Sequence, residues 1–227
     1  MTAKKPADTD KRQWRQMPAE FRRRQLMDAT IAVISDVGIS KATVGLVAAH
    51  AKLSPAIVNL QFGNKNTMLV ETFKSMRNDF RDAWVAAQVA DVARDNVAMR
   101  ISNMLQVYFY PEQCSPQKLR VWFAFLGEAA ARETYLDITQ RYEDNYVRAL
   151  TDMCADLIAQ GGYTHLRAEH IARSLLAACD GLWVARMLRP DTLSPEACRE
   201  NLAALLAMAF PDHFPASPNS NEDTATA

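Results

Sequence analysis

The stretch LSPAIVNLQFGNKNTML, residues 53–69, decides the fold of the amino-terminal part of this 227-residue chain. Ser54 is a residue type that caps helices, and Pro55 suits the first helical position, where a missing amide hydrogen costs nothing. The sequence therefore predicts a helix near 55–61 that ends before Gly63. So short a helix is not stable alone, and its neighbours must hold it in place.

A second short helix precedes this one. Thr43 is an expected N-cap, which predicts a helix near 44–51. Only residues 52–54 then separate the two helices. Two short helices joined by a tight turn are typical of a helix-turn-helix, although a plain corner between two helices inside a helical domain has the same pattern.

Helical spacing divides the side chains of this motif into two faces. The apolar positions predict an inward face that closes on Ile31 and Ile34 of the preceding helix. The residues expected on this inward face are Val47, Ala48, Ala51, Leu53, Val58 and Phe62.

The outer face of the second short helix is left to Pro55, Ala56, Asn59 and Leu60. The major groove of DNA is about 12 Å wide and admits such a helix, so these side chains would meet base edges. Asn59 can pair bidentately with adenine, whereas Ala56 and Leu60 can contact a thymine methyl group. Lysines and hydroxyl groups near the helix starts suit phosphates. The candidate DNA-binding residues are Thr43, Val44, Lys52, Ser54, Pro55, Ala56, Ile57, Asn59, Leu60, Gln61 and Lys65.

Charge is spread unevenly along the chain, although the formal net charge is zero. Residues 1–65 hold eleven lysines and arginines against five acidic residues, so residues 66–227 carry the acidic excess. A basic amino-terminal part predicts an anionic partner such as DNA, although such a part can also serve solubility alone. The consecutive arginines Arg22 to Arg24 favour the first interpretation unless they form a solvated face.

The rest of the chain also predicts helices, because glycine is scarce at seven residues and apolar residues recur at helical spacing. The fold class is therefore all-α, with a three-helix head followed by a larger helical domain. The expected boundaries are a basic disordered tail over 1–17, the head over 18–65, the larger domain over 66–210 and a disordered tail over 211–227. The expected helices cover residues 19–37, 44–51, 55–61, 66–88, 94–109, 116–131, 133–160, 168–188 and 194–209.

The sequence also bears on where the protein acts. Its four cysteines form no CxxC pair, which predicts reduced, buried thiols. The first seventeen residues lack the apolar core of a signal peptide, and the longest uncharged runs fall short of the ~18 apolar residues that a membrane span needs. These features predict a cytoplasmic protein with no membrane partner.

An enzyme is the main rival class of function. The sequence contains no phosphate-binding loop, GxSxG, HExxH or dinucleotide fingerprint. The densest cluster of potential metal ligands, His165, Glu169 and His170, does not share one helical face. We therefore expect no enzyme activity, no cofactor and no metal. A helical protein that coats DNA nonspecifically is a second rival, which gel-shift competition would separate, since specific sites usually win by ~10³ or more.

The helix-turn-helix resembles the TetR family of repressors, through a pattern that runs from Thr43 through VGLVAAHAKLS to Phe62 and Lys65. The similarity extends over about residues 18–210. Shorter stretches resemble the choline-responsive repressors of betaine synthesis within that family, and these are RRRQLMDAT (22–30), FGNKNTMLVET (62–72), WFAF (122–125) and DGLWVARML (180–188).

Three positions depart from the family pattern. Lys52 stands where a glycine is usual, because the turn favours a positive φ, so the lysine must tolerate that backbone or change it. Asn59 replaces a common tyrosine, and Gln61 replaces an aromatic residue or histidine. The operator sequence is therefore not transferable from relatives.

The resemblance implies a homodimer that binds a pseudo-palindromic DNA operator and is released by a small-molecule effector. Family members pair through their last two long helices, here near 168–188 and 194–209, and both carry wide apolar stripes.

The implied effector is choline or a related quaternary ammonium compound, with an unrelated hydrophobic molecule as the alternative. Quaternary ammonium groups prefer aromatic faces, although aromatic residues at helical spacing are also ordinary core. The candidate effector-binding residues are Trp122, Phe125, Tyr135, Tyr142, Asp180 and Trp183.

Overall fold

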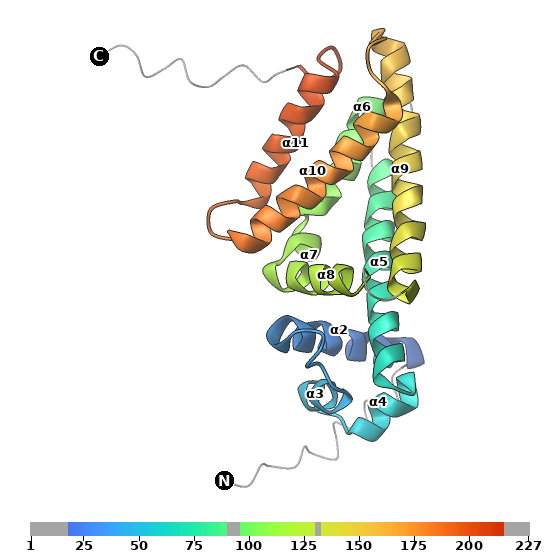
Figure 1. Cartoon of the computed structure of the whole chain (residues 1–227), viewed down its shortest axis with the longest axis vertical. Coiled ribbons are helices and arrows are strands. Elements are labelled where there is room, and N and C mark those ends of the chain that lie inside the picture. Colours follow the sequence, from blue (N-terminus) through green and yellow to red (C-terminus); the bar gives the residue numbers. More distant parts are fainter. Residues whose placement is uncertain (1–17, 90–95, 130–132, 216–227) are drawn as a thin grey trace, which may run out of the picture. The chain divides into compact units, whose positions relative to one another are not determined.

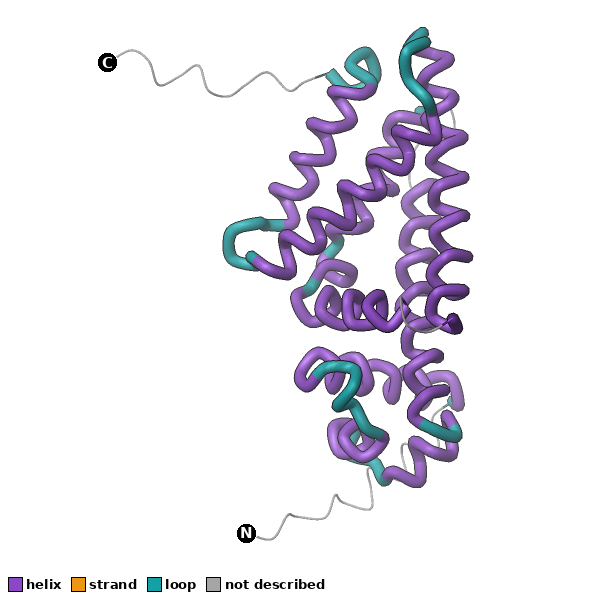
Figure 2. Tube along the Cα trace, in the orientation of Figure 1, coloured by secondary structure: helices purple, strands orange, loops and turns teal. Residues whose placement is uncertain are grey.

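The computed structural model describes residues 18–89, 96–129 and 133–215, and all regular elements in these ranges are helical (Figure 1; Figure 2). The expected tail over 1–17 lies outside the described residues. The elements are α2 (Ala19–Val37), α3 (Val44–His50), α4 (Pro55–Phe62), α5 (Lys65–Val89), α6 (Val97–Gln106), the 3₁₀ helix η1 (Val107–Phe109), α7 (Pro111–Cys114), α8 (Pro116–Ala129), α9 (Glu133–Gly161), α10 (Ala168–Leu188) and α11 (Pro195–Ala209).

The all-α prediction is confirmed, and most helices begin and end within a residue or two of their expected positions. The expected helix over 94–109 is different, because its described part divides into α6 and η1. Pro111 lacks an amide hydrogen and cannot continue an α-helix, so the chain tightens into a 3₁₀ turn before it. The sequence did not predict α7, since four residues are too few to show a helical period.

The described contacts divide the chain into two compact units. Unit 1 comprises Met1–Arg81 with Ser115–Tyr142, and unit 2 comprises Asp82–Cys114 with Glu143–Ala227. The domain boundaries expected from the sequence follow function rather than contacts, and they stay a prediction.

Unit 1 is built on the contacts of α2 with α3 and α8 and of α3 with α4. Helix α2 ends at Gly38, whose φ of 80° suits glycine and whose N–H donates to the Ile34 carbonyl over 2.8 Å. Leu26 and Ile34 of α2 are buried, as are Val47 of α3 and Val58 of α4. This apolar contact holds the short helices in place.

Unit 2 is built on the pairing of α10 with α11, which lie side by side in Figure 1. Its buried residues on this pair include Leu175, Cys179, Leu202 and Leu206.

The chain after α11 turns back within unit 2. The Tyr163 hydroxyl accepts a hydrogen bond from the Asp212 N–H over 2.9 Å and lies 3.1 Å from His213 Nδ1. The expected tail over 211–227 therefore begins with an ordered turn, and residues 216–227 lie outside the described residues.

The four cysteines are free and buried. Burial raises the pKa of the Cys154 thiol to about 12, and burial also raises the pKa of Cys179. These thiols therefore stay protonated and react slowly.

Lys52 lies between α3 and α4 with a φ of 57°, in the left-handed region that the usual family glycine would adopt without strain. The lysine has therefore tolerated the backbone of the turn rather than changed it.

We expect Lys52→Gly to raise the free energy of unfolding by about 0.5–1 kcal/mol, because relief of the left-handed strain exceeds the entropy that glycine adds to the unfolded chain. Urea unfolding measures this change. Lys52→Ala is the matched control, since it keeps the β-carbon and should give no such gain. Equal gains for both variants would contradict the role of backbone strain.

Candidate functional site

The start of the helix-turn-helix is fixed by bonds around α3. Thr43 Oγ1 accepts a hydrogen bond from the Leu46 N–H over 3.2 Å, so Thr43 caps α3 as predicted. At the other end the Leu53 N–H donates to the Ala48 carbonyl over 2.8 Å, which satisfies a carbonyl of the last turn. The direction in which the chain enters α4 is therefore set by local hydrogen bonds.

Ser54 lies at the N-cap position of α4, but its hydroxyl makes no capping bond. The expectation that its side chain caps the helix is therefore wrong. The Ile57 N–H donates instead to the Ser54 carbonyl over 3.0 Å, so the amide that a cap would satisfy already has a partner.

The rotation of α4 about its axis separates a buried face from an exposed one. Val58 is fully buried and Phe62 is 5% exposed, whereas Leu60 is 81% exposed and Asn59 is also exposed. The remaining predicted residues of α4 agree with this division, since Pro55 and Ala56 are exposed and Ile57 and Gln61 are half-buried.

The inward face predicted from spacing has a buried centre and a half-buried edge. Val58 and Phe62 are buried, as are Val47, Ala48 and Ile34. The edge residues Ala51, Leu53 and Ile31 are half-buried.

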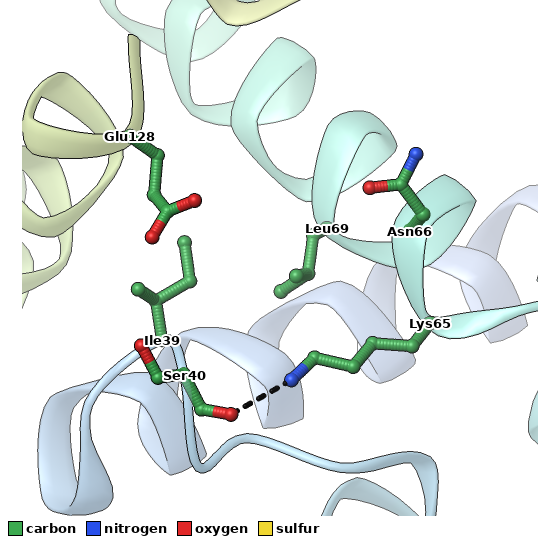
Figure 3. A pocket seen from close by; sticks show the side chains of 6 residues that line it. All are labelled: Ile39, Ser40, Lys65, Asn66, Leu69 and Glu128. Atoms are coloured by element: carbon green, nitrogen blue, oxygen red, sulfur yellow. Dashed lines mark hydrogen bonds between the residues drawn. The ribbon is translucent and has the colours of Figure 1, made fainter. Parts of the chain in front are cut away.

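The other predicted DNA-binding residues near α4 differ in their exposure and in the hydrogen bonds that they already make. Thr43 and Lys52 are exposed and Val44 is half-buried, although the Thr43 hydroxyl also serves as the cap of α3. Lys65, the first residue of α5, is half-buried, and its Nζ donates to the Ser40 carbonyl over 3.0 Å (Figure 3). An ammonium group has three hydrogens, so this bond leaves donors for a phosphate.

A pocket of about 410 Å³ lies around this lysine in unit 1. Figure 3 shows Glu128, near the end of α8, facing Ile39 of the loop that follows α2. The other lining residues are Ser40, Lys65, Asn66 and Leu69. The sequence did not indicate this pocket, because its walls come from segments far apart along the chain.

Two of the three consecutive arginines serve structure within unit 1. The guanidinium of Arg23 lies 4.8 Å from the centre of the Phe62 ring, donates to the Gln61 carbonyl over 3.0 Å and pairs with Glu71 at 3.1 Å. Arg23, which belongs to α2, therefore links this helix to the end of α4 and to α5.

Arg24 makes a second link between α2 and α5. Its two terminal nitrogens each donate to one carboxylate oxygen of Asp79 over 2.7 Å, and its Nε pairs with Asp28 at 3.2 Å. Hydrogen bonding to Asp79 raises the pKa of the Arg24 guanidinium. An arginine engaged in this way is not a free phosphate ligand, so the basic run supplies fewer DNA contacts than its composition indicated.

Four of the six candidate effector residues belong to unit 1, and three of them contribute to one aromatic cluster. Phe125 stacks on Phe73 with ring centres 4.8 Å apart, and Tyr135 lies 5.8 Å from Phe73. Trp122 lies 6.3 Å from the same ring and Tyr142 is half-buried. The structure therefore brings Trp122, Phe125 and Tyr135 together around Phe73, which was not among the residues expected from the sequence.

A cation of the chain lies at this cluster. The guanidinium carbon of Arg77 is 5.1 Å from the centre of the Trp122 ring, 5.2 Å from Tyr142 and 5.7 Å from Phe73. We call the rings of Phe73, Trp122 and Tyr142 the aromatic box. Arg77 is 3% exposed, and it donates to the Thr139 carbonyl over 2.8 Å.

Arg77 was not among the residues expected from the sequence, although one signal marked it. Phe73, Arg77, Phe80 and Trp84 follow the helical spacing of a buried face, so the arginine occupies a position where an apolar residue is expected.

The other two candidate effector residues belong to unit 2. Trp183 is 1% exposed, and its indole N–H donates to the Tyr108 carbonyl over 2.7 Å. Asp180 is exposed on α10. Trp183 therefore has a structural bond that explains its burial.

Within the described residues, no three His, Cys, Asp or Glu side chains are grouped so as to hold a metal ion. No helix of the described part is long and apolar enough to cross a membrane.

Comparison with known proteins gives the class to which this architecture belongs. Residues 26–72 match the family described as bacterial regulatory proteins of the TetR family, and residues 97–211 match the carboxyl-terminal family of BetI-type transcriptional repressors. The HTH-type transcriptional regulator BetI of Rhizobium meliloti strain 1021 is 32% identical over 181 residues, which cover 78% of this chain and 83% of that protein.

Solved structures share the fold. A transcriptional regulator from Pseudomonas aeruginosa PAO1 has a TM-score of 0.75 and 24% identity, and the match covers 88% of this chain and 96% of that one. A transcriptional regulator from Saccharomonospora viridis, solved in complex with choline, has a TM-score of 0.68 and 18% identity, and the match covers 82% and 96%.

The fold and the helix-turn-helix thus define a transcriptional regulator that binds DNA. The chain belongs to the TetR family, and its carboxyl-terminal part places it with the BetI-type repressors of that family.

We expect Lys65→Ala to weaken binding to specific and random duplexes alike and to flatten the salt dependence of binding by about one unit for each protomer, because one phosphate contact is lost. Filter binding across a salt series measures the slope. Lys74→Ala is the matched control, since Lys74 is also on α5 but pairs with Glu71 at 3.2 Å. A slope that Lys65→Ala leaves unchanged would place Lys65 away from phosphate.

Proposed function

We propose that this repressor binds a pseudo-palindromic operator as a homodimer, with the exposed edge of α4 in the major groove of each half-site. The observation that carries the proposal is the separation of faces on α4. Leu60 is 81% exposed and lies beside the exposed Asn59, while Val58 and Phe62 hold the helix from the opposite side. A large apolar side chain left in water on so short a helix is explained when DNA covers it.

The exposed edge offers contacts of different kinds to base pairs. The Asn59 amide can donate to and accept from adenine in the major groove, and such a bidentate pair discriminates by about 1–3 kcal/mol. Ala56 and Leu60 can contact thymine methyl groups. Lys52, Thr43 and the backbone at the start of α4 face phosphates, which position the head without reading sequence.

The homodimer is supported by apolar side chains that the α10–α11 pair leaves uncovered within one chain. Met208 is 80% exposed on α11 and Leu188 is 70% exposed on α10, with Val184 and Leu205 each 38% exposed. Apolar exposure on both helices of one pair suits a second copy of the chain. Two heads related by a two-fold axis would then meet half-sites about 34–36 Å apart.

A small molecule would regulate the repressor by favouring one arrangement of the helices, with a coupling of about 1–3 kcal/mol between effector and DNA. The BetI-type match and the choline-bound relative support choline or a related quaternary ammonium compound as the first class of effector to test. An unrelated hydrophobic molecule is the second class. Because an operator lies on DNA inside the cell, the repressor acts in the cytoplasm and has no catalytic role.

We expect Asn59→Ala to weaken binding to the duplex that the protein selects from a randomised pool by about 1–3 kcal/mol, while binding to random duplex stays unchanged. The reason is that Asn59 reads a base rather than a phosphate. Gel-shift titrations on both duplexes measure the two affinities.

Asn145→Ala is the matched control, because Asn145 is an exposed asparagine on α9 in unit 2. Equal losses on the two duplexes would show that Asn59 reads no base. Equal affinity of the unaltered protein for every duplex at about 0.15 M salt would instead identify a nonspecific DNA-coating protein.

A further inference from the structure

Arg77 is the one buried cationic residue in the described ranges, and it comes from the middle of α5. Its guanidinium lies within 5.1–5.7 Å of the three ring centres of the aromatic box. Two of these rings come from other helices, since Trp122 is on α8 and Tyr142 is on α9. The box and its cation therefore join three helices of unit 1.

The geometry is that of a cation site. A positive group attracts aromatic faces when it lies within about 6 Å of the ring centre, and the attraction grows as water is removed. Arg77 meets this condition at all three rings and is 3% exposed. Its hydrogen bond to the Thr139 carbonyl fixes the guanidinium in the box, because a charged donor makes a strong bond.

A free cation competes poorly with a cation that is attached to the chain. Arg77 loses no translational freedom when it fills the box, whereas a soluble ligand does. A quaternary ammonium group would also have to share the box with a like charge or expel the guanidinium, and expulsion would break the bond to Thr139.

The surface beside the box offers a cation no excess of negative charge. A pocket of about 360 Å³ adjoins Tyr142, and its charged lining consists of Arg141, Asp137 and Lys74, which pairs with Glu71 at 3.2 Å. A positive ligand approaching Tyr142 from this side therefore meets no net negative charge in the lining.

We propose that Arg77 is the resident cation of the aromatic box and that it excludes quaternary ammonium ligands from Phe73, Trp122 and Tyr142. Arg77 is then a specificity-determining residue, since it decides the charge of any ligand that these rings accept. A cationic effector such as choline binds outside the box. The inference rests on the proposed function only in treating the protein as effector-regulated, because the box itself is formed by side chains of unit 1.

The experiment is a thermal shift titration with tetramethylammonium chloride, with sodium chloride at equal ionic strength as the reference. In the unaltered protein we expect no rise in melting temperature that Trp122→Ala would abolish. In Arg77→Ala, which empties the box but keeps its rings, about 50 mM cation should raise the melting temperature by roughly 5–9 °C if the new site has millimolar affinity.

Three variants separate the box from general effects of charge. Arg77→Lys retains a cation on the chain and should remain unresponsive. Arg148→Ala removes an exposed arginine from α9 and should also remain unresponsive. Adding Trp122→Ala to Arg77→Ala should abolish the gained response, because one wall of the box is lost.

A response of the unaltered protein that Trp122→Ala abolishes would overturn the inference, and so would the absence of a response in folded Arg77→Ala. If Arg77→Ala does not fold in buffer, circular dichroism in tetramethylammonium replaces the titration, with recovery of helix expected and no recovery contradicting the inference. Gel shifts on the selected duplex test the proposed function separately, since they need no cation.

Discussion

The burial of Val58 and Phe62 fixes how α4 is rotated about its axis, and the DNA-binding surface depends on this rotation. The two residues are four positions apart and therefore share one face, which leaves Asn59 and Leu60 toward water. A rotation by one residue would expose an apolar side chain and bury the Asn59 amide, and an unsatisfied buried amide costs about 1–3 kcal/mol. The turn at Lys52, with a φ of 57°, joins α4 to α3.

Arginine chemistry connects this head to the rest of unit 1. Arg23 and Arg24 of α2 pair with Glu71 and Asp79 of α5. Between these two acidic residues of α5, Arg77 lies among the rings of α8 and α9. Exposed ion pairs contribute little stability one at a time, but these contacts set the position of α5 relative to α2, α8 and α9. A ligand that moved α5 would therefore change the setting of the helices that hold α4.

Local features were predictable from the sequence, whereas contacts between distant segments were not. Helix positions and the two faces of α4 follow from caps and apolar spacing, which are properties of a few adjacent residues. The partner of Arg24 lies 55 residues away, so no local pattern identifies Asp79. Spacing likewise indicated that Trp122 and Phe125 face an interior, but it could not show that Arg77 lies at the same cluster. The composition of residues 22–24 consequently indicated more arginines available to bind DNA than the structure leaves.

The most direct test is the rate at which maleimide modifies Leu60→Cys, with and without the duplex selected by the protein. The four native cysteines are buried and free, so they react slowly and give a low background. With α4 in the major groove, bound duplex should slow modification at this position strongly and leave Asn145→Cys, on α9, unaffected. An unchanged rate at position 60 on the fully bound protein would show that this edge of α4 does not face DNA.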